Sequence, residues 1–436
     1  MVRLGPMTSP KFPPNRRVVI AGLGAAALVH LGPVMGYAQG RPSAAIKALP
    51  ESLAGLRDGP ATMVWGLSGG NLSFQRSETA NVTVGNGLPA PLSLHWRGLN
   101  GASAAEPLLA RTPLAAGASE SFPLTMLHAG SSLCDSGLLG DGLAHPLRSK
   151  PLIVLETERV PVDRDEVLFI EEWRLRPDGA AIAPGADPKD AKSVYTLNGS
   201  TSFELSASGN QRLRLRFING CQRTVLAVRL ESHEVRVMAI DGQPAEPFPA
   251  RNGAVVLAPG SRADVFVDTT TSAAILLHDG KQAYPIGKLA ISGSVERRAP
   301  LPPAAPLPSN GLPGQLDLKN AQRFDLALGA PADWTRPVDF KVAAPPAFRA
   351  KKGRAVVLAL TNRAAIATVF HLHGHHFRLL DRLDDGWKPF WLDTLAVEPG
   401  QTHRIAFLAE HAGRYLIESI AADWAAPRLV RWYAVE

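Results

Sequence analysis

The stretch Arg-Leu-Arg-Leu-Arg-Phe at residues 212–217 alternates charged and apolar side chains, and a similar alternation recurs at residues 92–96 (Leu-Ser-Leu-His-Trp) and 262–268 (Arg-Ala-Asp-Val-Phe-Val-Asp). Successive side chains of a β-strand point to opposite faces, so this pattern predicts half-buried strands. Gly, Pro, Asn and Asp punctuate the chain between such stretches, which is typical of antiparallel β-sandwiches. No long segment after residue 40 shows helical periodicity. We therefore expect an all-β protein.

The chain is expected to divide into three β-modules. The turns Ala-Pro-Gly-Ser (258–261) and Glu-Pro-Gly-Gln (398–401) each precede an alternating stretch, which indicates an internal repeat. Residues 297–314 contain six prolines and predict an extended linker without a core of its own. The expected first, second and third modules cover residues 41–155, 156–296 and 315–436.

Residues 1–38 are expected to form a signal peptide. The pair Arg16-Arg17 precedes a Gly- and Ala-rich apolar run at residues 18–31, and small residues before Gln39 suit a signal peptidase. Paired arginines ahead of a weakly hydrophobic run indicate the twin-arginine route, which exports folded proteins. We expect the mature protein in the periplasm or cell envelope of a bacterium. An uncleaved N-terminal anchor is the alternative.

Composition excludes several classes of function. The 436-residue chain is 45% hydrophobic and 19% charged, as soluble globular proteins are, and its net charge of +7 is too small to indicate nucleic-acid binding. Its two cysteines, Cys134 and Cys221, exclude a disulfide framework and any cluster of several thiolates. No transmembrane span is expected in the mature chain.

The most informative motif is Phe-His-Leu-His-Gly-His-His-Phe at residues 370–377. On a strand, His371, His373 and His375 share one face. Four of the twelve histidines of the chain lie in this motif, and imidazoles at this spacing suit copper or zinc. A polar strand edge without metal is the plainer alternative.

With this motif the sequence resembles the multicopper oxidases, which are laccase-like proteins of three cupredoxin domains. Residues 371–377 fit the second half of that family's late histidine motif, and His95-Trp96-Arg97-Gly98 is similar to its early one. The middle of the chain is similar to the family's second domain at residues 197–199, 214–220, 239–242 and 257–262. The resemblance implies three Greek-key β-sandwiches, a mononuclear copper that takes electrons from substrate, and a trinuclear cluster that reduces oxygen.

The residues that the family uses for the mononuclear copper are replaced here. The resemblance assigns two histidines and a cysteine to this site, and the matching positions hold Thr368, Trp424 and Ser419. Without a thiolate or either imidazole, we expect that this copper site cannot form.

The trinuclear site is expected to be incomplete as well. Of the four His-x-His pairs that the resemblance implies, only His371 and His373 are intact. His95 remains in the first pair but its partner is Arg97, the second pair becomes Asp135 and Gly137, and the fourth becomes Glu418 and Ile420. His128 is an alternative member of the second pair.

Two hypotheses follow for the place where the family binds its trinuclear copper cluster. In the first, Arg97 pairs with Asp135, Glu418 or both, with His373 as a further donor, and no cofactor is bound. In the second, His95 and His371 hold a single copper or zinc ion with a carboxylate.

For function, the sequence favours a non-redox scaffold or binding protein of the envelope, whose protein partner it does not identify. The resemblance to the family's copper-free member that assists bacterial cell division supports this by analogy. The alternative is a copper-binding, laccase-like oxidoreductase.

Overall fold

The computed structural model describes residues 42–292, 301–381, 386 and 388–436. The expected signal peptide and residues 297–300 of the expected linker lie outside this part of the chain. None of the helices among the described residues is long and apolar enough to cross a membrane.

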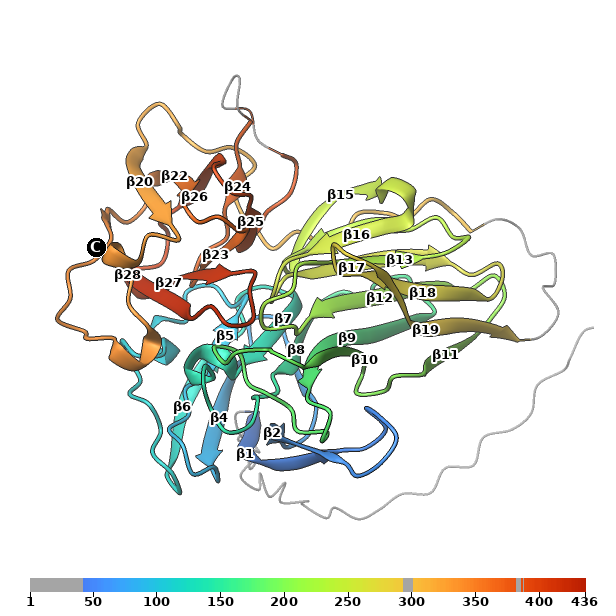
Figure 1. Cartoon of the computed structure of the whole chain (residues 1–436). Helices are drawn as coiled ribbons and strands as arrows, with labels where there is room; N and C mark the ends of the chain where they lie inside the picture. The colour runs from blue at the N-terminus through green and yellow to red at the C-terminus, as the bar shows by residue number, and fades with distance from the viewer. Residues whose placement is uncertain (1–41, 293–300, 382–385, 387) are drawn as a thin grey trace, which may run out of the picture. The chain divides into compact units, whose positions relative to one another are not determined.

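The all-β prediction is confirmed. Apart from short 3-10 turns, the described elements are strands (Figure 1). The turns are η1 (Ser103–Ala105), η2 (Gly137–Leu139), η3 (Arg251–Gly253), η4 (Pro331–Asp333) and η5 (Pro337–Asp339).

The strands of the described residues form six sheets, two in each module. The first module contains β1 (Ser43–Leu53), β2 (Thr62–Ser68), β3 (Leu72–Gln75), β4 (Thr79–Asn86), β5 (His95–Arg97), β6 (Ser119–Thr125), β7 (Gly130–Asp135) and β8 (Lys150–Leu155), in sheets ordered β2-β1-β4-β6 and β3-β8-β7-β5.

The second module contains β9 (Arg164–Leu175), β10 (Lys192–Leu197), β11 (Phe203–Ser208), β12 (Arg212–Asn219), β13 (Leu226–Leu230), β14 (Arg236–Ile240), β15 (Gln243–Pro249), β16 (Ala254–Leu257), β17 (Arg262–Asp268), β18 (Ala273–His278) and β19 (Ala283–Ser292). Its sheets are ordered β10-β9-β12-β17-β14-β15 and β11-β19-β18-β13-β16.

The third module contains β20 (Gln322–Leu328), β21 (Arg349–Ala350), β22 (Ala355–Asn362), β23 (Thr368–Leu372), β24 (Arg378–Leu379), β25 (Thr394–Val397), β26 (Thr402–Leu408), β27 (Gly413–Ala421) and β28 (Arg428–Val435). Its sheets are ordered β20-β22-β26-β24 and β21-β28-β27-β23-β25.

The internal repeat that the sequence indicated is visible in the strand pairing. In one sheet of each module, β1, β9 and β20 run parallel to β4, β12 and β22, which in turn pair antiparallel with β6, β17 and β26. In the other sheet, β5, β13 and β23 pair antiparallel with β7, β18 and β27. Equivalent strands of different modules can therefore present side chains in equivalent places.

Each module has its own apolar core between its two sheets. In the first module Ile46 and Val82 of one sheet join Trp96 and Leu152 of the other in one buried cluster. The second and third modules have corresponding clusters. Alternate residues of each strand fill these cores, as the period of two predicts.

For residues 212–217, the expected strand and its antiparallel pairing, here with β17, are confirmed, but the expectation that the strand is half-buried is wrong. The whole of β12 is buried, and it runs parallel to β9 on one side. Its charged face is covered because Arg214 and Arg216 both pair with Asp264, whose other oxygen accepts a hydrogen bond from Ser131 of the first module. The alternation in the sequence predicts that successive side chains of this strand point to opposite faces. It does not indicate that the first module covers the polar face.

Candidate metal centre

The candidate centre lies where equivalent strands of the first and third modules meet. His95 on β5 is paired across the sheet with Asp135 on β7, and His371 on β23 is paired with Glu418 on β27. Directly opposite residues of paired strands point to the same face. The two modules therefore each contribute a histidine and an acid at the same register.

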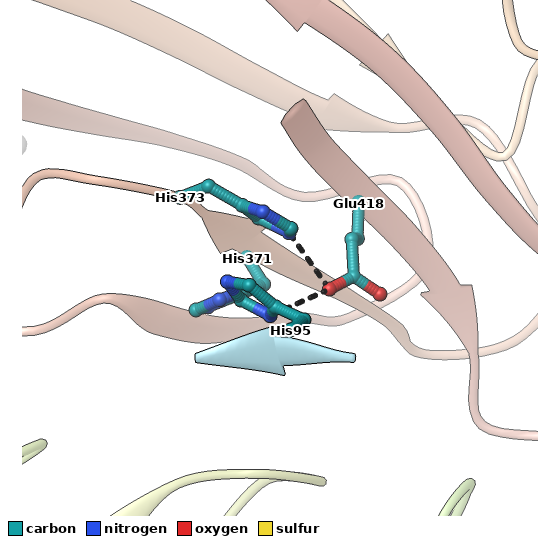
Figure 2. Close-up of side chains that lie close together, drawn as sticks. All are labelled: His95, His371, His373 and Glu418. Atoms are coloured by element: carbon teal, nitrogen blue, oxygen red, sulfur yellow. Dashed lines mark hydrogen bonds and ion pairs between the residues drawn. The ribbon is translucent and has the colours of Figure 1, made fainter. Parts of the chain in front are cut away.

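Four side chains from these strands converge. His95, His371, His373 and Glu418 each offer one atom to a point where all four atoms lie within 4.8 Å of one another (Figure 2). The rings of His95 and His373 are stacked with centroids 3.5 Å apart. All four residues are buried. The three histidines that the sequence selected are thus brought together.

Arg97 lies beside this group, and the ion pair expected for it is present. Its Nη2 lies 3.0 Å from Asp135 Oδ2 and 3.0 Å from Glu418 Oε1, and its side chain is 1% exposed. Gly260, in the Ala-Pro-Gly-Ser turn, has a φ of +80°, and a Cβ there would come within 2.6 Å of Arg97 Cδ. The second module therefore leaves room for the guanidinium only because this residue is glycine.

His373 is held between two carboxylates. Its Nδ1 lies 2.6 Å from Glu106 Oε1 and its Nε2 lies 2.9 Å from Glu418 Oε1. Burial lowers the pKa of His373, but the two carboxylates outweigh burial and raise that pKa to about 9. The ring is therefore an imidazolium at neutral pH, as its two acceptors require.

Arg428 supplies a second guanidinium to the same acids. Its Nη1 lies 3.1 Å from Asp135 Oδ2 and 3.1 Å from Glu418 Oε2, and its Nη2 donates to Gln222 Oε1 at 2.9 Å. Burial raises the pKa of Asp135 and Glu418, but Arg428 and Arg97 outweigh it and hold both pKa values below their usual range. Both acids are therefore ionised.

These contacts form one charge network. It contains three cations and three anions, so its formal charge is zero at neutral pH. The members of the charge network are Arg97, Arg428, His373, Asp135, Glu418 and Glu106.

The remaining two histidines of the group are neutral. Burial lowers the pKa of His95, and burial followed by the charge of Arg97 lowers the pKa of His371 to about 3. His371 Nδ1 lies 2.9 Å from the backbone oxygen of Asp393. His95 Nδ1 and His371 Nε2 are buried without a hydrogen-bond partner among the described residues. These two lone-pair donors are the groups in the centre that a metal ion would use.

Two other positions assigned to the trinuclear site, Gly137 and Ile420, offer no side-chain ligand. Gly137 donates its backbone N–H to Asp135 Oδ1 at 2.8 Å. Ile420 is buried against Val369 and Ala258. His128, the alternative member of the second pair, contacts Gln243 at 3.0 Å.

The three positions assigned to the mononuclear copper make ordinary structural contacts. Thr368 Oγ1 donates to Asn362 Oδ1 at 3.2 Å, and Ser419 Oγ accepts the Gly329 N–H at 3.4 Å. Trp424 Nε1 donates to the Ala183 oxygen of the second module at 3.1 Å.

Sequence reasoning missed Glu106 and Arg428. Glu106 lies in a loop and Arg428 at the start of β28, and neither belongs to a histidine motif. Charge balance was the available signal, because a buried Arg97 between two acids leaves one negative charge without compensation. Charge balance therefore predicts a further cation near Arg97, but it does not indicate which arginine of the chain supplies this charge.

Comparisons with known proteins agree with this architecture. Models of the multicopper oxidase family match residues 166–275 and 315–436, which together are more than half of the chain. The chain therefore belongs to the multicopper oxidase family.

Relatives and solved structures extend the match to most of the described chain. Multicopper oxidase MmcO of Mycobacterium tuberculosis is 24% identical over 403 residues, covering 77% of this chain and 75% of that protein. Laccase-8 of Oryza sativa subsp. japonica is 25% identical over 288 residues, covering 59% of this chain and 51% of that protein.

Among solved structures, a multicopper oxidase from Pseudomonas thermotolerans has a TM-score of 0.78 at 24% identity, covering 90% of this chain and 99% of that one. Lac15 from a marine microbial metagenome has a TM-score of 0.73 at 22% identity, covering 91% of this chain and 100% of that one. At this identity the likeness shows the fold alone.

Proposed function

We propose that this protein is an exported member of the multicopper oxidase family that has lost oxygen-reducing copper chemistry and acts as a non-redox binding or scaffold protein. The observation that carries the proposal is the contact of Arg97 with Asp135 and Glu418 at 3.0 Å. A guanidinium is a permanent cation, and the resemblance to the family's early histidine motif aligns Arg97 with a copper ligand.

The donors around the charge network do not fit a trinuclear copper cluster. Both nitrogens of His373 face carboxylate oxygens, and Arg97 fills the space between the acids. Adding dications to a buried network that is already neutral would leave uncompensated positive charge, which is costly in a poorly solvated site.

The donors at the mononuclear position do not fit a blue copper either. Such a site needs a thiolate and two imidazoles, and a Thr, a Ser and a Trp occupy the matching positions. Cys134 and Cys221 are both fully buried, and burial raises the pKa of each thiol. No electron entry point is available at this position.

Copper loading tests the proposal. Protein purified after expression with added copper is expected to be colourless, to hold less than one copper per chain, and to consume no oxygen with phenols or aromatic amines. Blue colour with oxygen uptake would overturn the proposal.

Export by the twin-arginine route to the periplasm or cell envelope is part of the proposal and rests on the sequence of residues 1–38. Replacing Arg16 and Arg17 by lysine is expected to retain the protein in the cytoplasm, as measured by cell fractionation. A protein partner in the envelope is expected, by analogy with the copper-free family member in cell division. Unchanged export in the double variant would contradict the assigned route.

Single-metal binding is a second candidate, favoured by the unpartnered nitrogens of His95 and His371. Copper or zinc in the centre would be held by these two imidazoles with Glu418. Metal analysis decides between the candidates, since one ion per chain that is lost in His371→Ala but kept in His278→Ala supports single-metal binding. His278 is an exposed histidine on β18 and provides the matched control.

A further inference from the structure

A cleft of about 620 Å³ lies between the first and second modules, apart from the charge network. Its walls come mainly from β8 and β9, which Figure 1 shows next to each other. This volume is in the range of pockets that hold small organic ligands. The cleft is therefore large enough to be a binding site.

One part of the cleft wall is apolar for a structural reason. Leu152 and Val154 of β8 point into the core of the first module, so Ile153 between them points outward. On β9, Val167 and Phe169 likewise line the cleft, while Leu168 enters the core of the second module. The second faces of these two strands form the apolar part of the wall, in which Phe169 is buried and Ile153 and Val167 are half-buried.

The arginines of the cleft are already neutralised. Arg148 forms ion pairs with Glu51 at 2.8 Å and Glu171 at 2.7 Å. Arg216 makes paired contacts with Asp165 at 2.6 and 2.8 Å. Neither guanidinium is free to attract a ligand strongly.

Lys150 differs from these arginines. Its Nζ donates to the backbone oxygens of Gly69 at 2.9 Å and Leu67 at 3.4 Å, and no ion pair with a carboxylate is present in the described part of the chain. An ammonium has three N–H donors, so one remains for a ligand. Lys150 lines the cleft and is half-buried. It is the one cation of the cleft wall without a carboxylate partner among the described residues.

We propose that this cleft binds a small amphipathic carboxylate, with its apolar body on Ile153, Val167 and Phe169 and its carboxylate on Lys150. This inference goes beyond the proposed function and does not depend on it, because no residue of the charge network lines the cleft.

Calorimetric titration with decanoate and decan-1-ol tests the proposal, because these probes share one apolar chain and differ in charge. The protein without its leader is expected to bind decanoate about tenfold more tightly than decan-1-ol at pH 7.5. Lys150→Gln is expected to remove this difference. Lys288→Gln is the matched control, since Lys288 is 61% exposed on β19 and pairs with Glu204.

A second variant tests the location. Ser73 is an exposed residue of the edge strand β3 at the rim, and Ser73→Trp places an indole over the cleft without altering a core. It is expected to weaken both probes at least tenfold, with circular dichroism confirming an unchanged fold.

Three outcomes would overturn the proposal: no binding of either probe, equal affinity for both probes, or unchanged affinity in Ser73→Trp. Copper content and oxidase activity are measured on the same samples and test the proposed function separately.

Discussion

At the scale of single residues, the side chains around Arg97 differ in charge from those that hold a metal cation. A copper ligand donates a lone pair to a cation, whereas Arg97 is itself a cation and needs anions around it. Asp135 and Glu418 each lie 3.0 Å from Arg97, so the charges of these three side chains compensate one another. Any one of these three side chains without the other two would be a buried, unpaired charge.

Removing Arg97 should therefore destabilise the protein strongly. Arg97→Met keeps much of the side-chain volume but takes one cation from two buried acids, and is expected to cost about 3–5 kcal/mol in the free energy of unfolding by urea. Arg97→Lys is expected to cost less. Arg336→Met, which breaks an exposed pair with Asp339, should cost less than about 1 kcal/mol. Equal stability of Arg97→Met and Arg336→Met would contradict the role of the charge network.

The raised pKa of His373 makes stability depend on pH. Its pKa of about 9 in the folded protein lies above the unfolded value near 6.5, so protonation stabilises the fold fully below about pH 6.5. This contribution, on the order of 3 kcal/mol, is lost as pH rises towards 9. Urea unfolding at several pH values should show stability falling across this window in the wild type, and less steeply in Glu106→Gln. The same slope in both proteins would refute this assignment.

At the scale of the elements, strand register decides which side chains meet. On β27, Glu418 is paired with His371 and Ser419 with Phe370, so the two neighbours face opposite sides of the sheet. Glu418 thereby joins the module junction, and Ser419 joins the interior of the third module. The same alternation on β12 places its arginines against the first module.

Loss of a negative charge should lower the free energy of unfolding far more at the buried end of the β12–β17 pair than at its exposed end. Asp264→Asn removes the negative charge that Arg214 and Arg216 share at a fully buried site. This change is expected to lower the free energy of unfolding by about 3–5 kcal/mol. Asp268→Asn on the same strand breaks a pair with Arg212 at a side chain that is 44% exposed, and should cost about 1 kcal/mol or less. Comparable losses in urea unfolding would argue against burial as the cause.

At the scale of the whole described chain, the charge network joins modules that the sequence separates widely. Arg428 of the third module contacts Asp135 of the first and Gln222 of the second. Its pKa remains high because Asp135, Glu418 and Asp141 outweigh the effect of burial. This one side chain links all three modules.

Loss of Arg428 should weaken the coupling between modules. Differential scanning calorimetry of the wild type is expected to show one cooperative transition, and Arg428→Met is expected to split or broaden it because Asp135 and Glu418 lose a shared cation. Arg336→Met is the surface control. A single unbroadened transition in Arg428→Met would count against this coupling.

Much of the fold could be predicted from the sequence because strand alternation and turn residues act locally. Residues 212–217 and 262–268 are strands, and the turns at 258–261 and 398–401 precede equivalent strands. The local pattern could not predict that β12 is buried on both faces, because its polar face is covered by residues of another module.

The sequence by itself determined the all-β class and the three candidate histidines, because these depend on residue type and spacing, and it led to the expectation that the family's copper ligands are replaced. Only the tertiary structure decided that Glu106 and Arg428 complete the charge network and that β8 and β9 leave a cleft. The physical reason is that charge compensation and cavity shape arise between residues far apart in the chain, and no local pattern encodes which distant side chains will meet.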